Sequence, residues 1–308
     1  MNENLYVLCM MQNSLGWKSR VKNYNIFAKH INDTPRAKLY TAEIAFGNRC
    51  HEVTSFGDYH HLQLRTDCEL WNKEGAINEL IKRLPEDAEY IAWVDADVVF
   101  TRPDWVAETV RLLQHYDVIQ LFSHTQDLGA SCQPSGPILK SYYYRYVEAG
   151  RDVKALKKEW ITGLAWASKK SVLSKIGMLP DWCVFSSCDR HIAAGFLGVM
   201  ESSFRESLTH EYKIKCMQWG QRAYDVVKGN VSYLPGLLLH YWHGNRKNRG
   251  YVERWNVMAG CHFNPELDIV KDWQGLYRFT DHNPQLREAF RMLMRTRNED
   301  EQGEVLIP

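Results

Sequence analysis

The sequence lacks the patterns that mark several classes of protein. None of its eight cysteines forms a C-x-x-C pair, so the usual zinc-ligand spacing is absent and free thiols in a reducing compartment are expected. No run of about 18 apolar residues occurs, and we therefore expect no membrane span. The N-terminus shows no basic stretch followed by a long apolar run, as a signal peptide would. These absences lead us to expect a cytoplasmic protein.

Neither sign of charge is in excess. The chain carries 38 Lys and Arg against 37 Asp and Glu, a formal net charge of +1, so no overall basic field indicates nucleic-acid binding. Internal repeats and low-complexity linkers are missing as well. The 308 residues, 45% of them hydrophobic, suffice for a sizeable core in one large α/β domain or two smaller ones.

Apolar runs and helical patterns alternate along the first half of the chain. The expected strands are short apolar or alternating runs at residues 4–11, 37–46, 51–55, 61–65, 90–94 and 117–122. The expected helices have apolar residues at helical spacing and cover residues 20–30, 70–84 and 103–115. This alternation predicts an α/β fold with a mostly parallel sheet flanked by helices.

The second half is less regular. Residues 123–159 are rich in loops, apart from an aromatic helical stretch at 142–146. Later strands are expected at residues 161–168, 231–233 and 237–240, and later helices at 170–176 and 206–228. The acidic residues from Asn298 onward are expected to fray. We divide the chain into a domain of residues 1–260 and a C-terminal helical extension, 261–308, that packs on it.

Two aspartates directly follow an apolar strand in Tyr90–Phe100, YIAWVDADVVF. Residues two apart in a strand point to the same side, so Asp95 and Asp97 can both face the crevice beyond the carboxyl edge of the sheet. Paired carboxylates suit Mg²⁺ or Mn²⁺, which bridges substrate phosphates. A D-x-D triplet also arises by chance about once in such a chain, and the plain alternative is a turn with two solvated aspartates. The position after a strand favours the metal site.

The surrounding block, residues 73–105, resembles the core of the GT-A glycosyltransferases. It reads KEGAINELIKRLPEDAEYIAWVDADVVFTRPDW, in which a helix carrying an Asn precedes the strand that ends in D-x-D. The resemblance implies a GT-A-like, Rossmann-related fold and a nucleotide-diphosphate sugar donor, which we expect to be a UDP-sugar. It also implies that Asp97 binds the metal, that Asp95 contacts the donor ribose or metal-bound water, and that Lys73 and Asn78 lie near the nucleotide.

Histidines follow the last predicted strand in Leu237–Arg249, LLLHYWHGNRKNR. This segment resembles the H-x-x-G-x-x-K pattern of glycogenin-like retaining transferases, with one extra residue before the glycine. Positions 240 and 242 share a strand face and 243 does not, which favours His240 as a metal ligand beside the two aspartates. His243 is then expected on the phosphate or acceptor side. A histidine near a strand end is more often structural, so the choice between the two stays open.

Three further residues are candidates for donor binding. Lys247 and Arg249 follow the histidines and can balance diphosphate charge, Arg by bidentate contact and Lys as a point charge. Glu43 ends the second predicted strand, a position that often meets the nucleotide in this fold. A solvated glutamate at a strand end is an equally good interpretation of Glu43.

Residues 161–191, ITGLAWASKKSVLSKIGMLPDWCVFSSCDRH, resemble the acceptor segment of the same family. Asp189 takes the place of the acidic residue that opens a helix, although Ser186, Ser187 and Cys188 stand where glycines and a Glu are common. If Asp189 is the general base, the anomeric centre inverts. If the glycogenin-like enzymes are closer, configuration is retained and Asp189 only holds the acceptor. The sequence leaves both outcomes open.

The acceptor is not specified by these motifs. The chain resembles glycosyltransferase-like proteins of tailed phages, which implies the host cytoplasm and makes a hydroxymethylated pyrimidine in DNA one candidate acceptor. Basic stretches at residues 246–254 and 287–297 fit DNA contact, but donor phosphate binding and a solvated helix face explain them better. Two rival functions are a catalytically silent nucleotide-binding protein of the same fold and a metal-dependent nucleotidyltransferase. The second rival needs a carboxylate for a second ion and a Gly-Ser phosphate loop, and the sequence shows neither.

Overall fold

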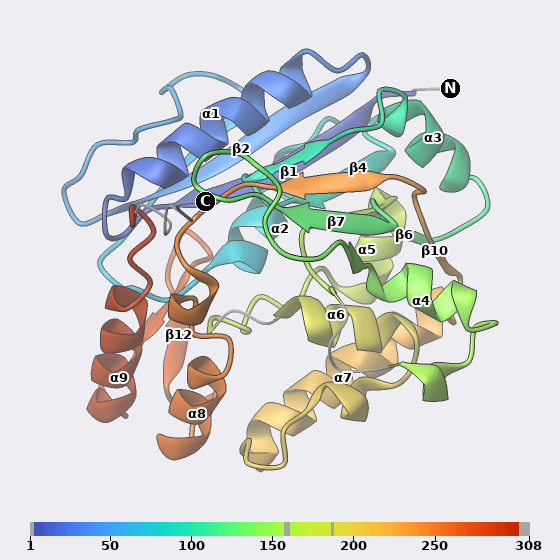
Figure 1. The fold of residues 1–308 in the computed structure, drawn as a ribbon. Helices are drawn as coiled ribbons and strands as arrows, with labels where there is room; N and C mark the ends of the chain where they lie inside the picture. The colour runs from blue at the N-terminus through green and yellow to red at the C-terminus, as the bar shows by residue number, and fades with distance from the viewer. Residues whose placement is uncertain (1–2, 157–160, 186–187, 302–308) are drawn as a thin grey trace.

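The computed structural model describes residues 3–156, 161–185 and 188–301. Its centre is a seven-stranded sheet of order β10-β6-β9-β4-β1-β2-β3, in which only β9 runs antiparallel to its neighbours (Figure 1). The strands of this sheet are β1 (Leu5–Gln12), β2 (Ala37–Phe46), β3 (His61–Thr66), β4 (Tyr90–Val94), β6 (Val118–Gln120), β9 (Ala165–Lys169) and β10 (Val231–Tyr233). The predicted fold class, a mostly parallel sheet flanked by helices, is confirmed.

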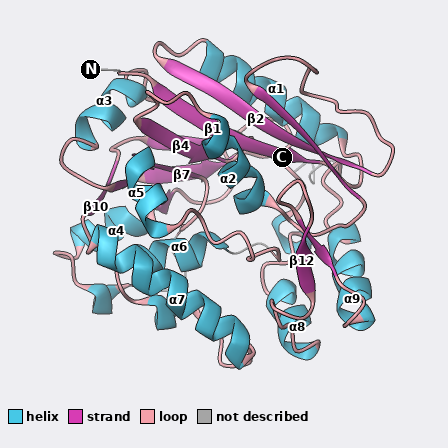
Figure 2. Ribbon diagram, turned by 180° about the vertical axis from the view of Figure 1, so that it is seen from behind, coloured by secondary structure: helices cyan, strands magenta, loops and turns pink. Residues whose placement is uncertain are grey.

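Helices cover both faces of the sheet (Figures 1 and 2). The helices of the described residues are α1 (Lys18–Asn32), α2 (Lys73–Arg83), α3 (Trp105–Leu112), α4 (Tyr142–Glu148), α5 (Lys170–Ile176), α6 (Cys188–Phe196), α7 (His210–Val227), α8 (Glu253–Gly260) and α9 (Pro284–Arg295), of which α8 and α9 pack against each other rather than on the sheet. Strand β1 shows why both faces are needed, since all eight of its residues are buried. Its side chains alternate between a core with α1 and α3 and a larger core that contains residues of α2, α5, α6 and α7.

A second sheet of four strands continues from the end of β4. Its order is β5-β11-β7-β8, with β5 (Val98–Phe100), β7 (His124–Asp127), β8 (Leu139–Lys140) and β11 (Leu237–His240). The turn that carries the two aspartates joins β4 to β5, and β5 pairs antiparallel with β11 in a register that sets His240 opposite Val98. The backbone N–H of Tyr241 donates to the carbonyl of Asp97 at 2.8 Å. Strand pairing therefore brings the D-x-D turn next to the late histidines.

The structure corrects three expectations about the strands. The strand expected at residues 161–168 is β9, which begins only at Ala165. Residues 51–55 form a loop rather than a strand, because the carboxylate of Glu43 accepts hydrogen bonds from the backbone N–H groups of Glu52, Val53 and Thr54. The region 123–159 is not only loop and helix, since it contains β7 and β8. The side chains of β7 are polar, which hid this strand from a search for apolar runs.

The C-terminal part contains more than helix. A hairpin of β12 (Ile269–Lys271) and β13 (Tyr277–Phe279) precedes α9, and α8 packs against α9. Asn298 to Glu301, expected to fray, are held against the body of the protein, whereas 302–308 lie outside the described residues. No helix in the described ranges is long and apolar enough to cross a membrane.

Candidate active site

A cavity of about 750 Å³ opens beyond the carboxyl ends of β1 and β4. Ligands of open α/β sheets bind at this edge, because the strands end there and loops of variable sequence follow. The cavity is lined by several residues predicted from the sequence, namely Lys73, Asp95, Asp97, Asp189, His240, His243 and Arg249. The sequence motifs therefore converge on one site, although they are spread over nearly 180 positions.

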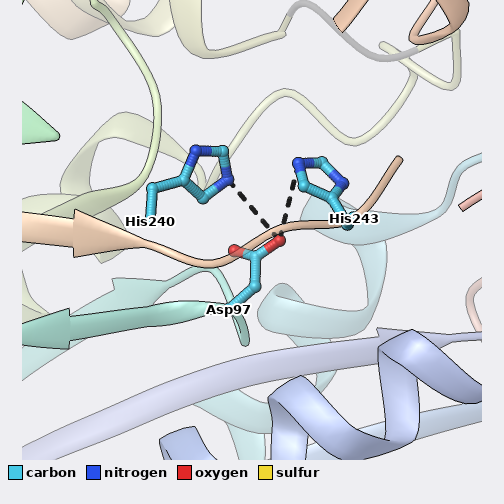
Figure 3. Close-up of side chains that lie close together, drawn as sticks. All are labelled: Asp97, His240 and His243. Carbon is cyan, nitrogen blue, oxygen red and sulfur yellow. Dashed lines mark ion pairs between the residues drawn. The ribbon is translucent and has the colours of Figure 1, made fainter. Parts of the chain in front are cut away.

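Three side chains form a candidate metal centre in this cavity (Figure 3). Both imidazoles face the carboxylate of Asp97, with Oδ2 at 3.6 Å from His240 Nε2 and 3.9 Å from His243 Nε2. One ligand atom from each residue can be chosen so that all three lie within 4.8 Å of one another. Asp97 Oδ1 and His243 Nε2 are buried and have no hydrogen-bond partner among the described residues. Buried polar atoms without partners are costly, so a cation bound here would satisfy them.

A fourth side chain orients the centre from the neighbouring strand. Asp127, the last residue of β7, accepts a hydrogen bond from His240 Nδ1 at 2.8 Å. That bond leaves the lone pair of Nε2 directed toward Asp97 whenever the imidazole is neutral. Metal-binding histidines commonly donate their other ring N–H to a carboxylate in this way.

The charges of the centre are strongly coupled. Burial alone would lower the pKa of His240, but Asp97 and Asp127 raise it to about 10. Burial opposes ionisation of Asp97, yet His240 and His243 hold its pKa below the ordinary value. Burial and the positive charge of Arg249 lower the pKa of His243 well below its usual range. The protein thus favours one positive charge beside Asp97, which is the arrangement a cation site requires.

Asp95 lies in the same cavity but has a different partner. Lys73 Nζ is 2.6 Å from Asp95 Oδ1 and 3.4 Å from Asp189 Oδ1, so one ammonium joins both carboxylates. Asp189 fits against the backbone because residue 163 is glycine, where a Cβ would lie 3.0 Å from Asp189 Oδ2. The sequence predicted Asp95 as the third metal ligand beside Asp97 and His240, whereas the cluster around Asp97 contains His243 and not Asp95.

The other predicted donor-binding residues either lie outside the cavity or form hydrogen bonds with other parts of the protein. Asn78 exchanges two hydrogen bonds with the backbone of Leu179 and lines a separate hollow of about 320 Å³. Glu43 is buried beneath the loop that it holds. Lys247 is exposed and is not among the residues that line the cavity. Arg249 lines it, but its guanidinium donates to the carbonyl of Gly244.

The alternation of side chains in a strand predicted that His240 and His243 face different sides. The structure instead places both beside Asp97. Alternation of side chains holds only inside a strand, and β11 ends at His240. Tyr241 and Trp242 lie outside the strand, and the ring centroid of His243 lies 4.9 Å from that of His240.

Some residues of the cavity had no signal in the sequence. Asp127 belongs to a polar strand in a region expected to be loop. Glu299 comes from the acidic tail, and its carboxylate pairs with Arg20 at 2.6 Å and Arg297 at 2.8 Å. Glu74 is buried beside Lys73, and burial, countered in part by Lys73, raises its pKa to about 8. The contact of Asp127 with His240 and that of Glu299 with Arg20 join segments far apart in the chain.

No family model matches the sequence, and no curated protein matches it either. Solved structures are similar in fold. The mannosyltransferase PcManGT from Pyrobaculum calidifontis, in complex with GDP-Man and Mn²⁺, is 11% identical with a TM-score of 0.46, over 95% of this chain and 69% of that one. TarS 1–349 from S. aureus, in complex with UDP-GlcNAc, is 11% identical with a TM-score of 0.42, over 79% of this chain and 60% of that one.

A third match is a 4-diphosphocytidyl-2C-methyl-D-erythritol synthase from Anaerococcus prevotii. It is 9% identical with a TM-score of 0.32, over 76% of this chain and 88% of that one. This chain spans less than two thirds of the TarS chain. At these identities and TM-scores, the function has to be inferred from the side chains of the cavity.

Proposed function

We propose that this protein is a metal-dependent glycosyltransferase with a nucleotide-diphosphate sugar as donor. The observation that carries the proposal is the centre of Asp97, His240 and His243, which shares a cavity with the guanidinium of Arg249 and the carboxylate of Asp189. A cation site and a nearby positive charge suit a diphosphate, and a carboxylate in the same cavity suits an acceptor hydroxyl.

The donor set favours Mn²⁺ over Mg²⁺. Two imidazoles and one carboxylate suit a transition-metal ion, whereas Mg²⁺ prefers oxygen ligands. A bound ion would neutralise charge on the departing diphosphate. Asp127 keeps His240 in the orientation that ligates, and Lys73 holds the carboxylates of Asp95 and Asp189 in place.

Within the cavity we assign the finer roles as follows. Asp189 receives the acceptor proton, and Asp95 meets the donor ribose or metal-bound water. A UDP-sugar is the proposed donor, and a hydroxyl group is the acceptor. The nucleotidyltransferase alternative has less support, because the described residues contain no second cluster of three metal-ligating side chains.

The test is a thermal-shift titration of UDP, GDP and CMP and their sugars, with and without Mn²⁺. A ligand at 100 times its Kd stabilises the native state by about 2.7 kcal/mol, which raises Tm. We expect a shift that requires Mn²⁺, is specific for one nucleotide, and disappears in Asp97→Asn. The matched control is Asp225→Asn, which removes an exposed carboxylate on α7 and should keep the full shift.

Turnover separates the enzyme from a silent binding protein of the same fold. Incubation with the matching nucleotide sugar and Mn²⁺ should release nucleoside diphosphate slowly, with water as the acceptor. Two results together would overturn the proposal in favour of the binding protein. The rise in Tm caused by a nucleotide would be the same with and without Mn²⁺ and in Asp97→Asn, and no nucleotide sugar would release nucleoside diphosphate.

A further inference from the structure

A second hollow of about 1070 Å³ adjoins the cavity with the metal centre. Four residues line both, namely Thr162, Arg190, Phe204 and Arg205. These residues lie at the boundary between the two spaces, so the second hollow is the immediate neighbour of the cavity. Asp189 lies on the cavity side of that boundary, one residue before Arg190 in the first turn of α6.

In the part of the chain that the structure describes, the boundary carries two guanidinium groups and no neutralising carboxylate. No acidic side chain in the described ranges forms an ion pair with Arg190 or Arg205. Arg190 donates one hydrogen bond to the carbonyl of Ser202 at 3.1 Å, and Arg205 lies over the ring of Trp255 at 5.5 Å. Both side chains are half-buried. Among the described residues, the remaining N–H donors of both groups therefore have no acidic partner in an ion pair.

Burial lowers the pKa of Arg190, and the like charge of Arg205 contributes to the lowering. Both guanidiniums are half-buried and line the same boundary, so an anion bound there would offset their like charge. Paired guanidiniums present forks of N–H donors that match the oxygens of a phosphate.

The rest of the hollow suits a small polar ligand with an apolar part. Lys213 and His210 add basic groups, and Ile214 and Met217 provide apolar surface. Two acidic residues, Glu201 and Glu206, also belong to the lining and are exposed. Their charge disfavours a long polyanion lying across the opening, whereas a single phosphate at the two arginines stays compatible with them.

We propose that the second hollow is the acceptor subsite and that the acceptor is a small phosphorylated molecule whose phosphate is held by Arg190 and Arg205. The assignment as acceptor rests on the proposed glycosyltransferase function. The acceptor hydroxyl oxygen bonds to the anomeric carbon of the donor, and the bond from that carbon to the diphosphate oxygen breaks. The nucleoside diphosphate leaves with the electron pair, and the hydroxyl proton passes to Asp189.

Calorimetric titration with inorganic phosphate, glycerol 3-phosphate and glycerol tests the subsite without metal or donor. We expect both phosphates to bind and glycerol not to bind. The double variant Arg190→Gln with Arg205→Gln should weaken phosphate binding at least about tenfold, because charge-assisted bonds to a phosphate are lost. Replacing the same two residues by Lys should restore part of the affinity, since charge returns without the fork.

Two controls separate this subsite from the donor site. Lys215→Gln with Arg295→Gln removes two charges outside both hollows and should leave phosphate binding unchanged. Asp97→Asn should also leave phosphate binding unchanged, so the phosphate subsite is tested independently of the proposed metal centre. Thermal melts of each variant establish that it is folded before its affinity is compared.

Three results would overturn the inference. The first is phosphate binding that is equal in the wild type and the Arg190 and Arg205 double variant. The second is phosphate binding that is lost only in Arg249→Gln, which would place the anion in the donor cavity. The third is binding of duplex DNA that depends on Arg190 and Arg205 while glycerol 3-phosphate does not bind, which would make DNA the acceptor.

Discussion

At the scale of single residues, the candidate metal centre depends on a carboxylate outside the cluster of Asp97, His240 and His243. Asp127 holds His240 through Nδ1, and the other nitrogen, Nε2, faces Asp97. Because an imidazole can bind an ion only through an unprotonated nitrogen, the hydrogen bond to Asp127 selects the useful tautomer.

The variant Asp127→Asn tests this role. An amide can donate a hydrogen bond to Nδ1, which would leave the proton on Nε2 and block the ligand. We expect the affinity for Mn²⁺, measured by calorimetry, to fall by about 10–100-fold while the fold persists. The control Asp225→Asn should keep wild-type affinity. An unchanged affinity in Asp127→Asn would mean that His240 is oriented by its strand alone.

Some residues of the site could be predicted because strand ends have a recognisable pattern. Asp97 and His240 each follow apolar residues, and the carboxyl edge of a sheet gathers such positions. Asp127 and His243 could not be assigned in the same way. Asp127 ends a polar strand, and His243 lies past the end of β11, where alternation no longer predicts direction. Their positions follow from strand pairing and loop conformation, which one sequence does not reveal.

At the scale of elements, buried strands and helices were predicted best. The strands at 37–46 and 90–94 and the helix at 170–176 have the predicted bounds, because apolar runs and spacing decide them. The prediction of a strand at 51–55 was wrong. The backbone N–H groups of this segment donate to the buried carboxylate of Glu43 and not to a neighbouring strand. Local propensity yields to such tertiary contacts.

Three helical elements, α6, η2 (Met200–Ser203) and α7, meet at a buried histidine. His191 of α6 bonds Ser203 of η2 through Nδ1 at 2.6 Å and Tyr212 of α7 through Nε2 at 3.1 Å. Burial, with a contribution from the charge of Arg190, lowers the pKa of His191 to about 3. The folded protein therefore keeps this imidazole neutral under conditions in which the unfolded chain protonates it.

The expected consequence is a loss of stability in acid. Between about pH 6.5 and pH 3 the unfolded chain binds one more proton at this position, so stability falls as the pH falls, by up to about 1.4 kcal/mol per unit. His191→Gln should be less stable at neutral pH, because its bonds change, but its Tm should fall less steeply from pH 6.5 to pH 4.5. Parallel Tm curves for the variant and wild type would contradict this account.

At the scale of the whole molecule, the C-terminal residues of the described chain pack against the start of α1 at the cavity. Glu299 is 1% exposed and pairs with Arg20 of α1, while Asp300 accepts hydrogen bonds from the first N–H groups of α1 at 3.0 and 2.8 Å. Gly244 lets the tail approach, because a Cβ there would lie about 2.9–3.0 Å from the backbone of residues 297–299. The C-terminal strap of residues 297–301 thus becomes part of the cavity wall.

Glu299→Gln tests whether this strap stabilises the fold. The change keeps the shape of the side chain but leaves the half-buried guanidiniums of Arg20 and Arg297 without this counter-charge. Removing one partner of a buried pair costs up to about 3–5 kcal/mol, which predicts a clear decrease in Tm and in the denaturant midpoint. Glu211→Gln, an exposed change on α7, should leave both values unchanged. Faster hydrogen exchange in the first turn of α1 would localise the loss to the strap, whereas an unchanged midpoint would show that water in the cavity already screens these charges.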